Sequence, residues 1–420
     1  MTYDFTTLGA LIGLALAIFL IVKQFPPVYS LLFGALVGGL VGGGGLGLTV
    51  DTMVSGSQSM IASVLRIMTS GILAGCLIRS GAAEKIAEVI VDRLGEKRGI
   101  LAIAIATMII CAVGVFVDIS VITVAPIALA IGKRANYNKP SILLAMIGGG
   151  KAGNIISPNP NTIATAEAFH VDLTSLMARN VIPAICAVIV TVIIANLLTK
   201  KSGSPVTEQD LEQREFTNLP SIWASMLGPI VVVVLLSLRP LFKITIDPLI
   251  ALPLGGFVCA VATGNMTKFK LYTEFGISKV IGVCVLLLGT GSIAGIIKAS
   301  ALQYDAINLM EMLNMPAFLL APIAGILMAG ATASTTAGAT IASQTFASTL
   351  IGAGIPPISA GAMVHAGATV IDSLPHGSFF HATGNAANMG IKERMRLIPY
   401  EAAVGLTSTI VAVIIYLIGF

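Results

Sequence analysis

The stretch GGGKAGNIISPNPNT, residues 148–162, decides the fold because it interrupts a helix inside an apolar run. Pro158 and Pro160 flank one asparagine, and proline both removes a backbone donor and disfavours helical backbone at the residue before it. The surrounding run, 140–168, is long enough to cross a bilayer. Broken backbone at membrane depth persists only where protein or a water-filled cavity satisfies its polar groups. The sequence therefore predicts a polar cavity at this break.

The rest of the chain has the composition of a membrane protein. Of its 420 residues, 56% are hydrophobic and 10% are charged, and the mean hydropathy is +0.95. A soluble globular domain carries roughly 25% charged residues, so this chain cannot solvate a folded surface of its size. The apolar runs are continuous, which excludes the alternating strands of a transmembrane β-barrel. The net charge of +4 forms no basic stripe, so no nucleic-acid partner is expected.

The apolar runs predict a bundle of membrane helices, divided once by a long polar stretch. We expect a first membrane repeat at 1–199, a solvated cytoplasmic linker at 200–220 and a second membrane repeat at 221–420. The runs lie at 6–23, 27–47, 57–79, 99–133, 140–168, 177–199, 221–239, 246–264, 279–298, 317–350, 355–388 and 400–419.

The two halves of the chain resemble each other. Residues 70–75, SGILAG, read like residues 290–295, TGSIAG. Further along, each half has polar residues inside a long apolar run and then a Gly-rich segment that leads into a proline motif. These features lie at 118–120 and 148–161 in the first half, and at 332–336 and 367–377 in the second. Matching interruptions in two halves are typical of transporters whose site lies at the repeat interface.

Charge placement predicts that the two repeats are inverted. With both termini outside and re-entrant hairpins at 99–133 and 317–350, all 24 basic residues but six belong to the cytoplasmic side. The six are Arg66, Lys151, Arg179, Arg239, Lys243 and Lys298. Ordinary spanning pairs give the same loop sides, so charge leaves that alternative open. The expected fold is an all-α polytopic membrane protein with an inverted structural repeat, broken helices and two re-entrant hairpins.

The first break carries the strongest candidates for solute binding. A helix that restarts after the break exposes amide donors, which attract carboxylates. Neutral side chains around it suit hydroxyl groups, and Lys151 is a natural counter-charge for an anion or for Asp118 or Asp372. The alternative is a proline kink in which asparagines satisfy the freed backbone and Lys151 makes a structural ion pair. The predicted substrate-binding residues here are Lys151, Asn154, Ser157, Asn159, Asn161 and Thr162.

The second break supplies the candidates for ion coupling. A carboxylate is costly inside a membrane, which favours a functional role for Asp372 in binding H⁺ or Na⁺. His376 titrates near neutral pH and could relay a proton, and Ser373 and Ser378 add hydroxyls. The alternative is a structural Asp–Lys or Asp–His pair.

The expected hairpin tips carry a third set of polar side chains. Asp118 and Ser120 lie in the first tip, and Ser334, Thr335 and Thr336 lie in the second. One carboxylate facing several hydroxyls can cradle a cation or a solute, and we assign Asp118 to ion coupling. The alternative is that the hydroxyls bond back to carbonyls of their own helices.

The chain also resembles the gluconate permease (GntP) family of the ion-transporter superfamily over nearly its whole length. The resemblance is carried by SGAAEKIA at 80–87, GEKR at 95–98, the hairpin that contains Asp118, KRA at 133–135, and 164–172 after the proline motif. It implies uptake of gluconate or a related small hydroxy acid together with protons. Both tips differ from the usual family pattern, since Ser157-Pro158-Asn159 stands where gluconate-type members carry a His-Pro pair.

Together these features predict a secondary transporter in the bacterial inner membrane. The expected partners are a small anionic solute, H⁺ or Na⁺ as coupling ion, and the lipid bilayer, with homo-oligomers left open. A Na⁺/H⁺ or other cation antiporter of the same superfamily is the alternative. The sequence predicts no enzyme activity, no cofactor and no metal site.

Overall fold

The structure, a computed structural model, describes residues 3–95, 98–201, 203–211, 218–242, 244, 246–302, 304–305, 308, 312, 316–375 and 377–419. These residues form helices joined by turns, and their β-pairing is limited to two isolated bridges, Phe5 with Ser300 and Asn138 with Pro205. The expected all-α fold is confirmed. Four helical elements in the described ranges are long and apolar enough to cross a membrane: Gly45–Arg79, Val181–Thr199, Met266–Ala299 and Ile391–Leu417.

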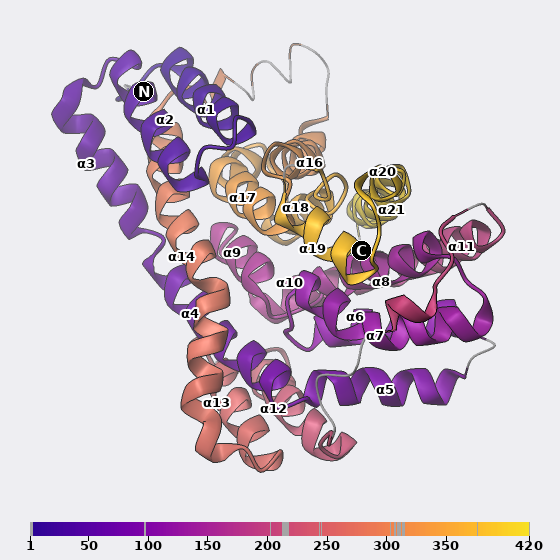
Figure 1. Ribbon diagram of the computed structural model, residues 1–420. Helices are drawn as coiled ribbons and strands as arrows, with labels where there is room; N and C mark the ends of the chain where they lie inside the picture. The colour runs from indigo at the N-terminus through magenta and orange to yellow at the C-terminus, as the bar shows by residue number, and fades with distance from the viewer. Residues whose placement is uncertain are drawn as a thin grey trace.

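The helices of the two halves follow one another in the same order (Figure 1). The first half contains α1 (Thr7–Val22), α2 (Pro27–Val41), α3 (Gly45–Gln58), α4 (Ile61–Arg79), α5 (Ala82–Leu94), α6 (Gly99–Ala112), α7 (Val117–Ala135), α8 (Lys139–Asn154), α9 (Pro160–Ala168), α10 (Leu173–Arg179) and α11 (Val181–Thr199). The second contains α12 (Ile222–Phe242), α13 (Pro248–Ala262), α14 (Phe269–Ala299), α16 (Leu320–Thr332), α17 (Thr335–Gly352), α18 (Pro357–Gly367), α19 (Ser378–Ala386), α20 (Ile391–Met395) and α21 (Ile398–Leu417).

The spacing of the helix starts repeats between the halves. Helices α7 and α17 begin 218 residues apart, and so do α8 and α18, α9 and α19, and α10 and α20, as the bounds above show. Each of the four apolar runs that the sequence shows to be interrupted by polar residues forms two helices. The first pair of runs gives the hairpins α6–α7 and α16–α17, and the second pair gives the broken helices α8–α9 and α18–α19.

Two long elements, which we call the arms, lie side by side at one edge of the molecule (Figure 1). One arm is α3 followed by α4, and the other is α14. They pack through glycines, because a Cβ on Gly56 would lie 2.2 Å from the carbonyl oxygen of Gly291, and one on Gly71 would lie 2.7 Å from that of Gly276. Gly276 is the repeat counterpart of Gly56, and Gly291 is that of Gly71, each 220 residues later. Superposing one half on the other therefore converts the Gly56–Gly291 contact into the Gly71–Gly276 contact. Such an exchange requires an antiparallel, two-fold-related pair, which confirms the inverted repeat.

The centre of this symmetry lies at Val64 and Cys284. These residues are also 220 apart, and Cys284 Sγ lies 3.7 Å from the carbonyl oxygen of Val64. A residue that contacts its own repeat counterpart sits on the pseudo-two-fold axis. The axis therefore crosses the arms near their middles.

The two hairpins enter the protein from opposite ends. Asn138, just after α7, donates to the carbonyl oxygen of Lys201 at 3.0 Å, and Lys201 Nζ donates to Tyr400 Oη at 3.2 Å. This places the open end of α6–α7 at the start of α21. The open end of α16–α17 lies at the other end of α21, where the rings of Phe318 and Tyr416 are 5.3 Å apart. This opposite entry is what the inverted repeats predicted from charge placement require.

Most of residues 203–211 of the expected linker are exposed, but the stretch is docked on the helices at two points. Ser204 donates its N–H and its hydroxyl to Glu393, at 2.9 and 2.6 Å. Lys139 Nζ lies 2.7 Å from Asp210 Oδ1. Burial would raise the pKa of Asp210, but hydrogen bonds from Lys139 and Thr207 outweigh it and hold that pKa at about 2. Residues 212–217 lie outside the described part of the chain.

Candidate functional site

A cavity of about 230 Å³ lies where both hairpin turns meet both helix breaks; we call it the site cavity. Four helices begin at its wall: α7, α9, α17 and α19. A helix N-terminus carries roughly half a positive charge and presents unpaired N–H groups. A cavity lined by four such ends favours a negatively charged occupant.

The structure brings eight of the predicted site residues to this one cavity. Both predicted tips and both predicted breaks contribute, although they are far apart in the sequence. The eight are Asp118, Asn154, Asn159, Asn161, Ser334, Thr335, Thr336 and Ser378.

At the first break, three asparagines form a hydrogen-bonded network. Asn159 Oδ1 accepts from the backbone N–H groups of Asn161 and Thr162, at 3.0 and 3.1 Å, and so caps α9. Asn159 Nδ2 and Asn161 Nδ2 both donate to Asn154 Oδ1, at 2.6 and 3.0 Å. The alternative predicted from sequence, in which asparagines satisfy the broken backbone, is therefore correct for Asn159.

Asn154 has an unused donor at the cavity wall. Its Nδ2 is buried and has no hydrogen-bond partner, and the side chain is 2% exposed. A buried amide without a partner is rare, because each lost hydrogen bond is costly. This N–H group is available to an acceptor oxygen of a bound solute.

At the second break, Asp372 is held in a buried ion pair. Its Oδ1 lies 2.6 Å from Lys151 Nζ, and the two side chains are 1% and 2% exposed. Lys151 Nζ also donates to the carbonyl oxygen of Thr369 at 2.7 Å. Thr335 and Ser373 donate to the same carboxylate, at 2.5 and 3.2 Å. The cavity wall includes Thr335 but not Lys151, Asp372 or Ser373.

Three other predicted residues lie behind the wall. Ser120 donates to the carbonyl oxygen of Phe116 at 2.9 Å, as the back-bonding alternative predicts. Thr162 is fully buried at the start of α9, and Ser157 is fully buried with no partner for its hydroxyl. His376 lies outside the described residues.

Sequence reasoning missed Lys279. We expected it among the charges of the cytoplasmic ends, but it lies inside α14 and lines the site cavity with Val283. Its charge attracts that of an ionised Asp118, which lines the same cavity. The structure places Lys279 ten residues from the start of the 31-residue α14, a depth that the sequence does not indicate.

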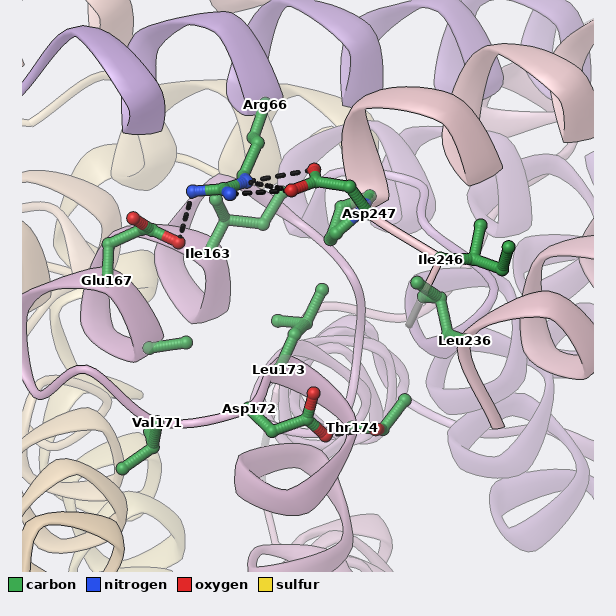
Figure 2. Close-up of a pocket in the computed structure, with 12 residues that line it drawn as sticks. Arg66, Ile163, Glu167, Val171, Asp172, Leu173, Thr174, Leu236, Ile246 and Asp247 are labelled. Carbon is green, nitrogen blue, oxygen red and sulfur yellow. Dashed lines mark hydrogen bonds and ion pairs between the residues drawn. The ribbon is translucent and has the colours of Figure 1, made fainter. Parts of the chain in front are cut away.

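Arg66, left unassigned by the sequence, joins α4 of one arm to the first broken helix and to the start of α13. Figure 2 shows it pointing between two carboxylates. Its Nη2 lies 2.6 Å from Asp247 Oδ2, just before α13, and its Nη1 lies 2.5 Å from Glu167 Oε1 in α9. The adjacent cavity holds only about 80 Å³, so we do not assign a solute site there.

A larger cavity of about 850 Å³ lies between the arms and the ends of α9 and α17. Ser59 and Ser63 of one arm, Lys298 of the other, and Glu167 and Gln344 line it. It shares no lining residue with the site cavity.

Comparison with known proteins agrees with this architecture. A profile described as GntP family permease matches residues 5–419. A Haemophilus influenzae protein named "Uncharacterized transporter" is 53% identical over 98% of both chains. The D-serine transporter DsdX of Escherichia coli K12 is 22% identical over 78% of this chain and 79% of its own. The high-affinity gluconate transporter of Escherichia coli K12 is 25% identical over 53% of this chain and 51% of its own.

One solved structure supports the fold. The crystal structure of the Alcanivorax borkumensis YdaH transporter, titled as having an unusual topology, aligns with a TM-score of 0.66. The alignment covers 89% of this chain and 88% of that one at 14% identity, so it supports the fold alone.

Proposed function

This chain belongs to the GntP permease family and is a multi-pass membrane transporter, and from that premise we propose that it is an H⁺-coupled symporter for a small hydroxy carboxylate. Gluconate is the first candidate. Binding takes place in the site cavity, and uptake runs across the bacterial inner membrane into the cytoplasm.

One observation carries this proposal: four helix N-termini and the free donor of Asn154 converge on one cavity. The helix ends favour a carboxylate, and a free amide suits a hydroxyl or carboxylate oxygen. Ser334, Thr336 and Ser378 add neutral hydroxyls to the wall. At about 230 Å³ the cavity is smaller than the roughly 300–1,000 Å³ of drug-sized ligand pockets. A small polyhydroxy anion matches both its size and its chemistry.

Asp118 is the coupling carboxylate in this proposal. It lines the site cavity, whereas Asp372 is held by Lys151. An ionised Asp118 repels the carboxylate of a solute, and a proton on Asp118 removes that repulsion. Proton and anion therefore favour each other's binding, and this coupling must be reciprocal. That mutual preference is what symport requires.

The relatives bear on the choice of solute. One is named for gluconate and another for D-serine, and both solutes carry a carboxylate and a hydroxyl. The polyhydroxy chain of gluconate makes fuller use of the hydroxyl-rich second tip. D-serine is therefore the competitor to include in every binding assay.

Uptake by the purified protein in liposomes tests the proposal. With an acidic exterior, labelled gluconate should accumulate inside, and a protonophore should abolish the accumulation. D-Glycerate and D-serine, added unlabelled, rank the competing solutes. Proton–cation exchange without solute movement would instead identify a cation antiporter and overturn the proposal.

A further inference from the structure

Building on the proposed function, we infer that Lys279 of α14 is the residue that recognises the carboxylate of the solute. The sequence pointed to Lys151 for this task. The two lysines differ in place and in partners, and the difference decides between them.

Two of the three N–H donors of Lys151 are already used inside the protein. It is 2% exposed, lies 2.6 Å from Asp372 Oδ1 and donates to the carbonyl oxygen of Thr369 at 2.7 Å. It is also absent from the wall of the site cavity. Its charge is balanced inside the protein, so a second carboxylate would gain little from it.

Lys279 has the opposite properties. It lines the site cavity and its side chain is exposed. Within the described part of the chain its charged end forms no ion pair and lies over the ring of Phe275, 5.1 Å from the centroid. An ammonium on a flexible four-carbon stem can move from an aromatic ring to a carboxylate. Asp118 and Lys279 are the charged residues of this cavity wall, so the anion would meet one cation there.

The repeat makes this cation specific to one arm. The counterpart of Lys279, 220 residues earlier, is Ser59, a neutral residue that lines the large cavity on the other arm. The site cavity therefore has Lys279 on its wall only while it lies against α14. Lys279 adds to carboxylate affinity in this conformation and would not add to it if the cavity faced α3 and α4.

Neutral and charge-preserving variants of Lys279 test the inference. Full-length protein in proteoliposomes is assayed for binding of gluconate and D-glycerate, and of their uncharged amides. Lys279→Gln should weaken binding of the acids by at least about tenfold, because a charge-assisted hydrogen bond is lost. Binding of the amides should change little. Lys279→Arg should retain most of the affinity for the acids.

Lys270→Gln is the matched control. Lys270 lies on the same helix with a side chain 89% exposed and does not line the site cavity, so its loss should leave all affinities unchanged. Lys279→Met is measured beside Lys279→Gln, so that one badly folded variant does not decide the outcome.

The outcomes separate this inference from the proposed function. If wild-type protein binds the acids and neutral Lys279 variants bind them equally well, the inference is overturned while the proposed function stands. Equal weakening of acids and amides would show a structural role and would also overturn it. If wild-type protein binds neither acid, the proposed function fails and the inference fails with it.

Discussion

Lys151 Nζ lies 2.6 Å from Asp372 Oδ1, with both side chains almost fully buried. The pair joins the first broken helix to the second, because Lys151 belongs to α8 and Asp372 to the segment between α18 and α19. Thr369, whose carbonyl oxygen also binds Lys151, follows it by 218 residues and is its repeat counterpart. The pair thus lies where the two repeats cross, and it neutralises both charges there.

This geometry gives a first prediction about stability. Removing one member of a buried ion pair leaves the other charge without compensation, which costs about 3–5 kcal/mol. Asp372→Asn and Lys151→Gln should therefore each lower the melting temperature strongly in detergent. The double variant should recover much of that loss, because replacing both members of a buried pair is often neutral.

The same variants decide whether Asp372 has a coupling role instead. A coupling role predicts that Asp372→Asn folds normally, binds solute and fails to concentrate it under a pH difference. Normal stability of this variant together with lost coupling would support the ion-coupling role that the sequence predicts for Asp372. Melting curves and uptake should therefore be recorded on the same preparations.

Asp118→Asn is the second prediction, and it concerns pH. A permanently neutral side chain mimics the protonated state, so solute binding should become independent of pH. The variant should exchange solute across the liposome membrane but should not accumulate it when the exterior is acidic. Asp247→Asn is a useful control, since Asp247 is paired with Arg66 and lies away from the site cavity. Accumulation with the normal pH response in Asp118→Asn would exclude Asp118 as the coupling residue.

The asparagines of the first break give the third prediction. Asn159 caps α9, so Asn159→Ala should lower both stability, by about 1 kcal/mol, and uptake. Asn159→Ser should restore stability, because serine is also a good cap. Asn161 lines the cavity and makes no cap, so Asn161→Ala should lower uptake with little change in melting temperature. Normal uptake by Asn161→Ala would reduce the motif to a structural kink.

The breaks and tips could be predicted from sequence because each leaves a local signal. Two prolines that flank one residue, as Pro158 and Pro160 do, break a helix, and Asp118 or Thr335 inside an apolar run must find a polar surrounding. Matching signals in the two halves then placed them at one interface. The structure adds that the four segments share a single cavity.

The ion-pair partners of the charged residues, and their depth in the membrane, could not be decided from the sequence, because both depend on how the helices pack. The sequence left three counter-charges open for Lys151, namely a solute anion, Asp118 and Asp372, and only the packing shows that Asp372 neutralises it. Lys279 follows Lys268 and Lys270, so a charge-based topology assigns it to the cytoplasmic end, whereas α14 carries it to the cavity. Likewise, part of the polar linker docks on the helices through the buried side chains of Val206 and Asp210. The polar composition of the linker does not indicate this docking.

Topology is the fourth prediction and tests the cytoplasmic placement of the linker. Lys200 and Lys298 are exposed residues, the first just after α11 and the second near the end of α14. In a cysteine-free background, an impermeant thiol reagent added to whole cells should label Lys298→Cys. Lys200→Cys should react only after the inner membrane is opened. Labelling of position 200 in intact cells would overturn the predicted orientation.

The fifth prediction uses the inverted repeat to locate the second conformation of the transport cycle. Asp118 and Lys279 both line the site cavity in this structure, and their charges interact. Their repeat counterparts, Thr336 and Ser59, line different cavities here. If the two halves exchange their conformations during transport, Thr336 and Ser59 must come to line one cavity, as Asp118 and Lys279 do now.

A cysteine pair at these two positions tests that exchange. In a cysteine-free protein, Ser59→Cys with Thr336→Cys should cross-link on oxidation, since a disulfide needs Cα atoms closer than about 7 Å. Cross-linking should increase when solute and a pH difference drive turnover, and it should stop uptake until a reductant is added. Each single variant should be insensitive to oxidation. A pair that never cross-links, or that still transports when cross-linked, would show that the arms do not exchange their contacts with the hairpin tips.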